Sequence, residues 1–308
     1  MKEGLVVKVS GNLCIVIDSA GKSYSCRIEG KLRIKEFKST NPIVVGDKIV
    51  FEFHDNYDVG IVKEIKDRKN YIIRKSTNLS KKYHIIAANV DQAFLIVTLK
   101  DPVTNIEFID RFLVSAEAYR IPVIIIFNKI DLYDSKTFEE LLKLRKIYDD
   151  IGYNCIEISA LLGINMDILM KHINSKITVI NGNSGVGKSQ LIKSINPSLN
   201  IKIRDISSFH KSGVHTTTYN EMYKIGTDGF LIDTPGIKGF GLIDFYKEEL
   251  YHYFPEIFAF SKNCKYYNCT HIHEPGCAVL KAIDKGEIAI SRYTSYFNLF
   301  FDANEKYR

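Results

Sequence analysis

Residues 182–189 read Gly-Asn-Ser-Gly-Val-Gly-Lys-Ser and constrain the fold more than any other stretch of the chain. The pattern is typical of a loop whose backbone N–H groups surround a phosphate, because glycine removes side-chain obstruction. Lys188 supplies a positive charge for the β- and γ-phosphates, and the Ser189 hydroxyl is a ligand for Mg²⁺. An apolar run at 177–180 precedes the loop and a helical pattern at 188–195 follows it. The segment therefore predicts a nucleotide-binding α/β domain.

Residues 128–131, Asn-Lys-Ile-Asp, indicate which base is bound. They follow an expected strand at 123–127, and ligands bind at the carboxyl ends of strands in α/β sheets. The Asp131 carboxylate can accept hydrogen bonds from the N1–H and amino groups of guanine, which adenine cannot donate. We expect Asn128 to stabilise the loop and the Lys129 stem to cover the purine. Ser159-Ala160 follows the next expected strand and offers the Ala160 N–H to the guanine carbonyl oxygen.

Two later segments have the character of switches that respond to the γ-phosphate. Asp233-Thr-Pro-Gly236 follows an expected strand at 229–232, so Asp233 can hold Mg²⁺ through water and the Gly236 N–H can contact the γ-phosphate. Residues 213–218, Gly-Val-His-Thr-Thr-Thr, form a second candidate switch, in which Thr217 can ligate Mg²⁺. An ordinary surface loop is the competing interpretation of 213–218 taken alone.

Hydrolysis needs a group that orients the attacking water. Many GTPases place a glutamine after the Asp-x-x-Gly motif, whereas this chain has Ile237. An apolar side chain cannot orient water, so we expect slow intrinsic hydrolysis. His215 in the first switch loop is the candidate catalytic residue, although a histidine in a polar loop is often simply exposed.

The order of these motifs is permuted, because the two base-recognition motifs precede the phosphate loop and both switches follow it. From residue 90 onward, apolar strands alternate with helical patterns at 108–119, 136–148 and 166–172. This alternation predicts a mostly parallel sheet with helices on both faces. The helix at 166–172 joins elements that normally end such a domain to the strand that normally begins it.

Residues 1–74 contain five short strand-like runs separated by turns, which predicts a small all-β barrel of the OB type. An SH3-like barrel is the alternative. The first 82 residues carry 17 Lys and Arg against 10 Asp and Glu, so the basic excess of the chain lies here. A basic barrel favours a polyanion partner, and a solvated basic surface is the simpler explanation.

Cys264-x₄-Cys269-x-His271-x₅-Cys277 gives three thiolates and one imidazole within fourteen residues. This set matches a closed tetrahedral site for one structural Zn²⁺. His273 competes with His271 as the fourth ligand, and three buried free thiols are the alternative to a metal site. The other cysteines, Cys14, Cys26 and Cys155, have apolar or strand-like neighbours and are expected to pack as small hydrophobic residues.

The longest apolar runs are too short to span a bilayer, and the first residues do not have the pattern of a secretion signal. We therefore expect a cytoplasmic protein with no membrane partner. We also expect it to be a monomer. The expected domains are an OB-fold RNA-binding domain at 1–74, a linker at 75–88, a permuted GTPase domain at 89–244 and a mainly α-helical zinc-binding domain at 245–308.

The permuted motifs, the preceding barrel and the Cys₃His cluster together resemble the RsgA family, whose members are circularly permuted GTPases that depend on the small ribosomal subunit. The resemblance implies GTP hydrolysis to GDP and phosphate during late maturation of the subunit, with binding to 16S rRNA near the decoding region. It assigns zinc to Cys264, Cys269, His271 and Cys277, and so favours His271 over His273. Many relatives have an arginine before the switch histidine, whereas this chain has Val214. Matched positions assign the guanine site to Asn128, Lys129 and Asp131, and the phosphate site to Gly182, Asn183, Ser184, Gly185, Val186, Gly187, Lys188 and Ser189. The motifs described above add Ser159, Ala160, Thr217, Asp233 and Gly236 to the expected GTP contacts, with Mg²⁺ expected at Ser189, Thr217 and Asp233.

These features predict an RNA-activated GTPase that acts as an assembly checkpoint on the small ribosomal subunit. One alternative is an RNA-binding module gated by GTP with negligible turnover, which Ile237 leaves open. A signalling GTPase that acts on a protein partner is disfavoured by the basic barrel.

Overall fold

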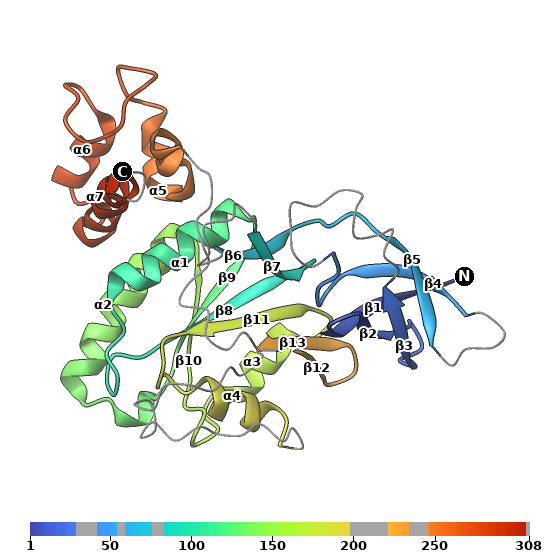
Figure 1. Cartoon of the computed structure of the whole chain (residues 1–308). Helices are drawn as coiled ribbons and strands as arrows, with labels where there is room; N and C mark the ends of the chain where they lie inside the picture. The colour runs from blue at the N-terminus through green and yellow to red at the C-terminus, as the bar shows by residue number, and fades with distance from the viewer. Residues whose placement is uncertain (29–41, 54–58, 76–82, 198–220, 234–245, 306–308) are drawn as a thin grey trace.

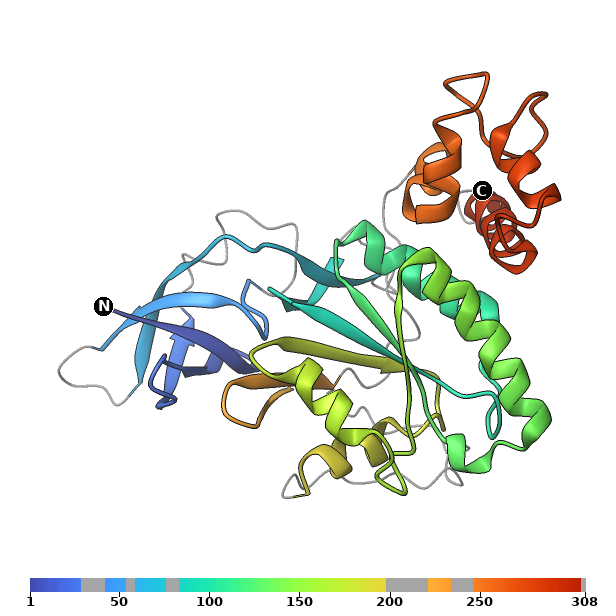
Figure 2. The same cartoon turned by 180° about the vertical axis from the view of Figure 1, so that it is seen from behind.

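The computed structural model describes residues 1–28, 42–53, 59–75, 83–197, 221–233 and 246–305. In chain order its elements form a barrel, a helix-covered sheet and a helical C-terminal segment (Figure 1). The C-terminal helices lie away from the barrel in both views (Figures 1 and 2). Among the described residues, no helix combines the length and the apolar character needed to cross a membrane.

The barrel has five strands, and their pairing distinguishes the OB type from the SH3-like alternative. The strands are β1 (Lys2–Ser10), β2 (Leu13–Ile17), β3 (Ser23–Ile28), β4 (Lys48–Glu52) and β5 (Gly60–Ile65). They pair in the order β1-β2-β3-β5-β4, and β4 returns to β1. Because β3 and β5 are parallel, strands that are not consecutive lie side by side, as in a Greek-key OB barrel. The OB-type prediction is therefore confirmed.

Alternate side chains along these strands form the barrel core. Val16, Cys26, Phe51 and Val62 are among its fully buried members. The thiols of Cys14 and Cys26 lie in this core, and burial raises the pKa of Cys14 to about 12 and that of Cys26 to about 11. These two cysteines pack as small hydrophobic residues, as the sequence predicted.

A separate two-stranded hairpin, β6 (Tyr71–Lys75) and β7 (Tyr83–Ala88), follows the barrel. Residues 83–88 thus form a strand inside the stretch expected to be a linker, and its last four residues, Ile85–Ala88, are apolar and buried. The hairpin contacts the barrel closely, because a Cβ on Gly46 would lie 2.0 Å from the Ala88 carbonyl oxygen.

The central sheet confirms the predicted α/β domain. Its strands are β8 (Gln92–Val97), β9 (Val123–Phe127), β10 (Asn154–Glu157), β11 (Ile177–Gly182), β12 (Glu221–Ile225) and β13 (Gly229–Asp233). The order is β10-β9-β8-β11-β13-β12, and every neighbouring pair is parallel except β12–β13. The carboxyl ends of β8, β9, β10 and β11 therefore meet at one edge, where the predicted nucleotide motifs begin.

Helices cover both faces of this sheet (Figures 1 and 2). One face carries α1 (Ile106–Ala118) and α2 (Ser135–Ile151), and the other carries α3 (Met166–Ile173) and α4 (Lys188–Ile195). The Asn105 and Asp134 side chains cap the first two helices by accepting from the backbone N–H groups of Glu107 and Thr137. Successive strand residues face opposite cores, so Val179 packs on the α1 side and Ile180 on the α4 side.

The barrel and the central sheet are continuous. Strand β1 pairs with β12 at Lys8 and Glu221, so β1 belongs to the barrel and also to an eleven-stranded sheet.

The candidate switch at 213–218 lies outside the described residues, and β12 is the first described strand after it.

The C-terminal segment consists of the 3-10 helix η4 (Lys247–Tyr253), α5 (Pro255–Ser261), α6 (Ala278–Asp284) and α7 (Ile290–Glu305). Its apolar core includes Leu250, Phe254 and Tyr296, together with Val114 from α1. The segment therefore packs directly on α1.

Candidate nucleotide and metal sites

The phosphate loop connects β11 to α4 and is packed too tightly for side chains at two of its glycines. Gly182 has φ +153°, and a Cβ there would lie 2.5 Å from the Ile96 carbonyl oxygen. Gly187 has φ +94°, and its Cβ would lie 2.5 Å from Asn128 Nδ2. The glycine pattern is thus explained by close approach of β8 and of the base-recognition motif.

Lys188 points into the curve of the phosphate loop. Its Nζ donates to the carbonyl oxygens of Gly182 and Asn183, both at 2.6 Å. Val186 is fully buried and anchors the middle of the loop, while Ser189 lies in the first turn of α4. The ammonium charge therefore lies where a bound phosphate would need it.

The side chain of Asn128 connects the phosphate loop to both base-recognition motifs. Its Nδ2 donates to the Val186 carbonyl oxygen at 2.8 Å, and its Oδ1 accepts from the Ala160 N–H at 3.0 Å. Asn128 is buried, so neither bond is exposed to competing water. The Ala160 N–H, assigned to the guanine carbonyl oxygen on sequence grounds, is directed at Asn128 here, so that assignment stays a prediction.

Asp131 lies in the 3-10 helix η2 (Ile130–Leu132), and one of its oxygens is already fixed. Ser159 Oγ donates to Asp131 Oδ1 at 2.5 Å and accepts from the Leu162 N–H at 3.1 Å. Ser159 is fully buried, whereas Asp131 is half-buried. Ser159 thus orients the carboxylate that the sequence assigned to guanine.

Two supporting residues, Tyr133 and Asp101, were not found from the sequence. The Tyr133 hydroxyl donates to the Asn128 carbonyl oxygen at 2.9 Å and accepts from the Leu99 N–H at 2.8 Å, and burial raises the Tyr133 pKa to about 12. Lys129 has φ +65° and donates from Nζ to the Asp101 carbonyl oxygen. These contacts join the base-recognition motif to the β8–α1 loop, and no spacing pattern in the sequence marks them.

The structure describes only some of the candidate switch residues. His215, Thr217, Gly236 and Ile237 lie outside the described residues. Asp233 ends β13, and its backbone pairs with Ile180 two residues before Gly182. The strand register therefore places the Asp233 backbone beside the start of the phosphate loop.

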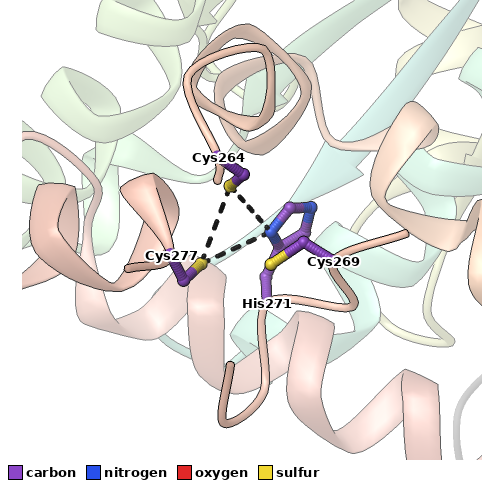
Figure 3. Close-up of side chains that lie close together, drawn as sticks. All are labelled: Cys264, Cys269, His271 and Cys277. Carbon is purple, nitrogen blue, oxygen red and sulfur yellow. Dashed lines mark hydrogen bonds between the residues drawn. The ribbon is translucent and has the colours of Figure 1, made fainter. Parts of the chain in front are cut away.

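The four predicted metal ligands converge in the C-terminal segment (Figure 3). His271 Nδ1 lies 3.6 Å from Cys264 Sγ and 3.5 Å from Cys277 Sγ, and the two sulfurs are 3.9 Å apart. Tetrahedral Zn²⁺ with ordinary Zn–S and Zn–N bonds needs about 3.6 Å between sulfur and nitrogen and about 3.8 Å between sulfurs. All four ligand atoms, including Cys269 Sγ, lie within 4.8 Å of one another. The donor set and its spacing therefore fit zinc.

The surroundings of the cluster favour His271 over His273. Cys269, His271 and Cys277 are buried, whereas His273 is exposed and outside the cluster. Burial raises the pKa of the Cys269 and Cys277 thiols and lowers that of His271. A metal that binds here must therefore displace thiol protons but meets an imidazole that is already neutral.

Comparison with known proteins agrees with these features. The RsgA GTPase family matches residues 65–243, and the RsgA N-terminal domain family matches residues 3–62. A Bacteroides fragilis protein named small ribosomal subunit biogenesis GTPase RsgA is 50% identical over 307 residues, which cover 99% of each chain. A protein of the same name from Porphyromonas gingivalis is 46% identical over 311 residues, which cover 99% of each chain.

Solved structures show the same architecture. YjeQ from Thermotoga maritima is 34% identical, covers 98% of each chain and superposes with a TM-score of 0.81. YloQ, described as a circularly permuted GTPase, is 31% identical, covers 100% of this chain and 96% of its own, and gives a TM-score of 0.79. The chain described here therefore belongs to the RsgA GTPase family.

Proposed function

We propose that this protein is a GTPase that the small ribosomal subunit stimulates, and that it acts as a late checkpoint in the assembly of that subunit. The observation that carries the proposal is the pair of hydrogen bonds in which the Asn128 side chain donates to Val186 and accepts from Ala160, because this pair joins the phosphate loop to the base-recognition motifs. Full-length relatives named for small-subunit biogenesis support the choice of partner. Such a role belongs to the cytoplasm, and we expect the protein to act there as a monomer.

We assign nucleotide binding and catalysis to different residues. Asp131, held by Ser159, recognises guanine, while Lys188 and the loop N–H groups bind the phosphates. Mg²⁺ neutralises phosphate charge in such sites, and we assign it to Ser189, Thr217 and Asp233. We assign the catalytic role to His215.

RNA binding is assigned to an aromatic and basic surface on the barrel. The Tyr24 and Phe53 rings lie 5.7 Å apart, and Phe53 is 38% exposed. Lys2 Nζ lies 4.7 Å from the Tyr24 ring centroid, and Lys22 Nζ lies 5.5 Å from it. Aromatic rings stack on unpaired bases and ammonium groups attract phosphates, so this surface suits single-stranded rRNA.

The Cys₃His site is assigned to one structural Zn²⁺. A closed site with four protein ligands leaves no position for a substrate, so the ion would stabilise the fold of the C-terminal segment. Metal analysis of freshly purified protein should give about one zinc per chain.

The test measures GTP turnover with and without purified small subunits. We expect slow turnover alone and strong stimulation by subunits. His215→Ala should bind GTP and subunits normally, lose most of the stimulated rate and remain on the particle. His273→Ala, which removes an exposed histidine, is the control. Absence of stimulation in the unaltered protein would favour the alternative of a GTP-gated RNA-binding module.

A further inference from the structure

The loop that carries His271 has a backbone conformation that requires support. His271 has φ +61°, in the left-handed region, although it is not a glycine. This conformation costs an L-residue roughly 1–2 kcal/mol, so neighbouring contacts must hold it. His271 is nonetheless buried, and it directs Nδ1 at two cysteine sulfurs (Figure 3).

Glu274 provides that support with both carboxylate oxygens. Oε1 accepts from the Thr270 N–H at 2.7 Å and from the Thr270 hydroxyl at 2.5 Å. Oε2 accepts from the N–H groups of Ile272 at 3.0 Å and His273 at 3.2 Å. The carboxylate thus holds the residues on both sides of His271.

Glu274 also contacts the next ligand, because its backbone carbonyl oxygen accepts from the Cys277 N–H at 3.2 Å. Two hydroxyls from α7 hold the same loop through its carbonyl oxygens. Tyr296 donates to Thr270 O at 2.6 Å, and Tyr293 donates to His271 O at 2.9 Å. The backbone N–H and carbonyl groups around His271 are therefore held by the side chains of Glu274, Tyr293 and Tyr296, which are not among the four metal ligands.

We propose that Glu274 is the positioning residue of the metal site and that it selects His271, rather than His273, as the fourth ligand. Both histidines lie on the segment that the carboxylate holds, but its bonds turn His271 into the cysteine cluster and leave His273 exposed. A residue that orients a metal ligand typically contributes 10- to 100-fold to metal affinity. This inference rests on the zinc site proposed above and is independent of GTP hydrolysis.

Glu274→Gln tests the role of the carboxylate at nearly constant size. A glutamine amide has one acceptor oxygen, and its NH₂ group would face N–H donors on one side of the loop. Competition with a chromophoric chelator should show zinc affinity reduced by about 10- to 100-fold. Glu287→Gln removes the same charge from an exposed position of this segment and should leave zinc affinity unchanged. Thr270→Val removes only the hydroxyl bond, so it should give a smaller loss if Glu274→Gln folds poorly.

Exchange of the two histidines distinguishes positioning from general stabilisation. In the unaltered protein, His273→Ala should change neither zinc affinity nor the visible spectrum of the Co²⁺-loaded site. In the Glu274→Gln background it should change both, because the released loop lets His273 replace His271. Unchanged zinc affinity in Glu274→Gln, or equal effects of His273→Ala in both backgrounds, would overturn the inference. Unaltered protein that binds no zinc would overturn the metal site itself, and the inference with it.

Discussion

Arg292 on α7 and Asp110 on α1 form a fully buried ion pair, with Nη1 2.6 Å from Oδ1. The same guanidinium donates from Nε to Glu256 Oε1 at 2.7 Å. The Tyr148 hydroxyl from α2 donates to Asp110 Oδ1 at 2.8 Å. Helices of the GTPase domain and of the C-terminal segment thus share one polar network in the interface between them.

Arg292→Met should destabilise this junction strongly. The change leaves Asp110 buried without its cation, and breaking a buried pair from one side costs about 3–5 kcal/mol. The expected result is a lower midpoint of urea unfolding for the C-terminal segment. Lys146→Met is the control, because Lys146 and Asp150 form a pair on the exposed surface of α2 and such pairs contribute about 0–1 kcal/mol. Equal shifts of the unfolding midpoint in the two variants would show that the buried network does not stabilise the packing of the C-terminal segment on the GTPase domain.

Short motifs and the bounds of some individual elements were predictable from the sequence. The phosphate loop, Asn128–Asp131 and the cysteine cluster each lie within at most fourteen residues of chain, so spacing alone marks them as candidate sites. The strand expected at 123–127 and the helix expected at 188–195 have the observed bounds.

Contacts between distant segments were not predictable, because they depend on tertiary packing. No pattern links Arg292 to Asp110, which lie 182 positions apart, or Lys8 to Glu221. Strand β7 was missed because the polar residues before it suggested a linker, whereas its pairing with β6 and burial of Ile85–Ala88 decide its structure. Tyr133 and Ser159 support the base-recognition motif through bonds that appear only when three strands are brought together.

Gly187→Ala should weaken binding of both GTP and GDP. The new methyl group would overlap Asn128 Nδ2, so the bond from Asn128 to Val186 would be lost or displaced. Fluorescent nucleotide titration measures the effect. Gly163→Ala is a matched control: Gly163 also has positive φ, but its Cβ would meet nothing within 4 Å. Each change adds roughly 1 kcal/mol of backbone strain, and only Gly187→Ala should reduce affinity. Comparable affinity losses in both variants would contradict the role given to the contact.

Asp131→Asn should exchange guanine for xanthine specificity. The amide offers a donor to the C2 oxygen of xanthine and loses an acceptor for guanine, so GTP affinity should fall and xanthosine triphosphate affinity should rise. Competition binding with the two nucleotides measures the exchange. Asp134→Asn, three residues later, keeps an N-cap for α2 and should leave both affinities unchanged. The assignment of Asp131 fails if its replacement leaves nucleotide preference unaltered.

Phe53→Ala should reduce stimulation by the small subunit more than the same substitution of an equally exposed aromatic residue elsewhere. Phe53 adjoins Tyr24 and Lys2 on the barrel, and loss of one base-stacking ring costs about 1–3 kcal/mol, or roughly 5- to 150-fold in affinity. The measurement is the subunit concentration that gives half-maximal GTP turnover. Phe138→Ala is the control, because Phe138 on α2 is 39% exposed against 38% for Phe53. Half-maximal concentrations should also rise steeply with salt in the unaltered protein, as expected when Lys2 and Lys22 neutralise phosphates. If Phe53→Ala and Phe138→Ala change the half-maximal subunit concentration equally, this face of the barrel does not bind the small subunit, and the basic residues that contact rRNA lie on another surface.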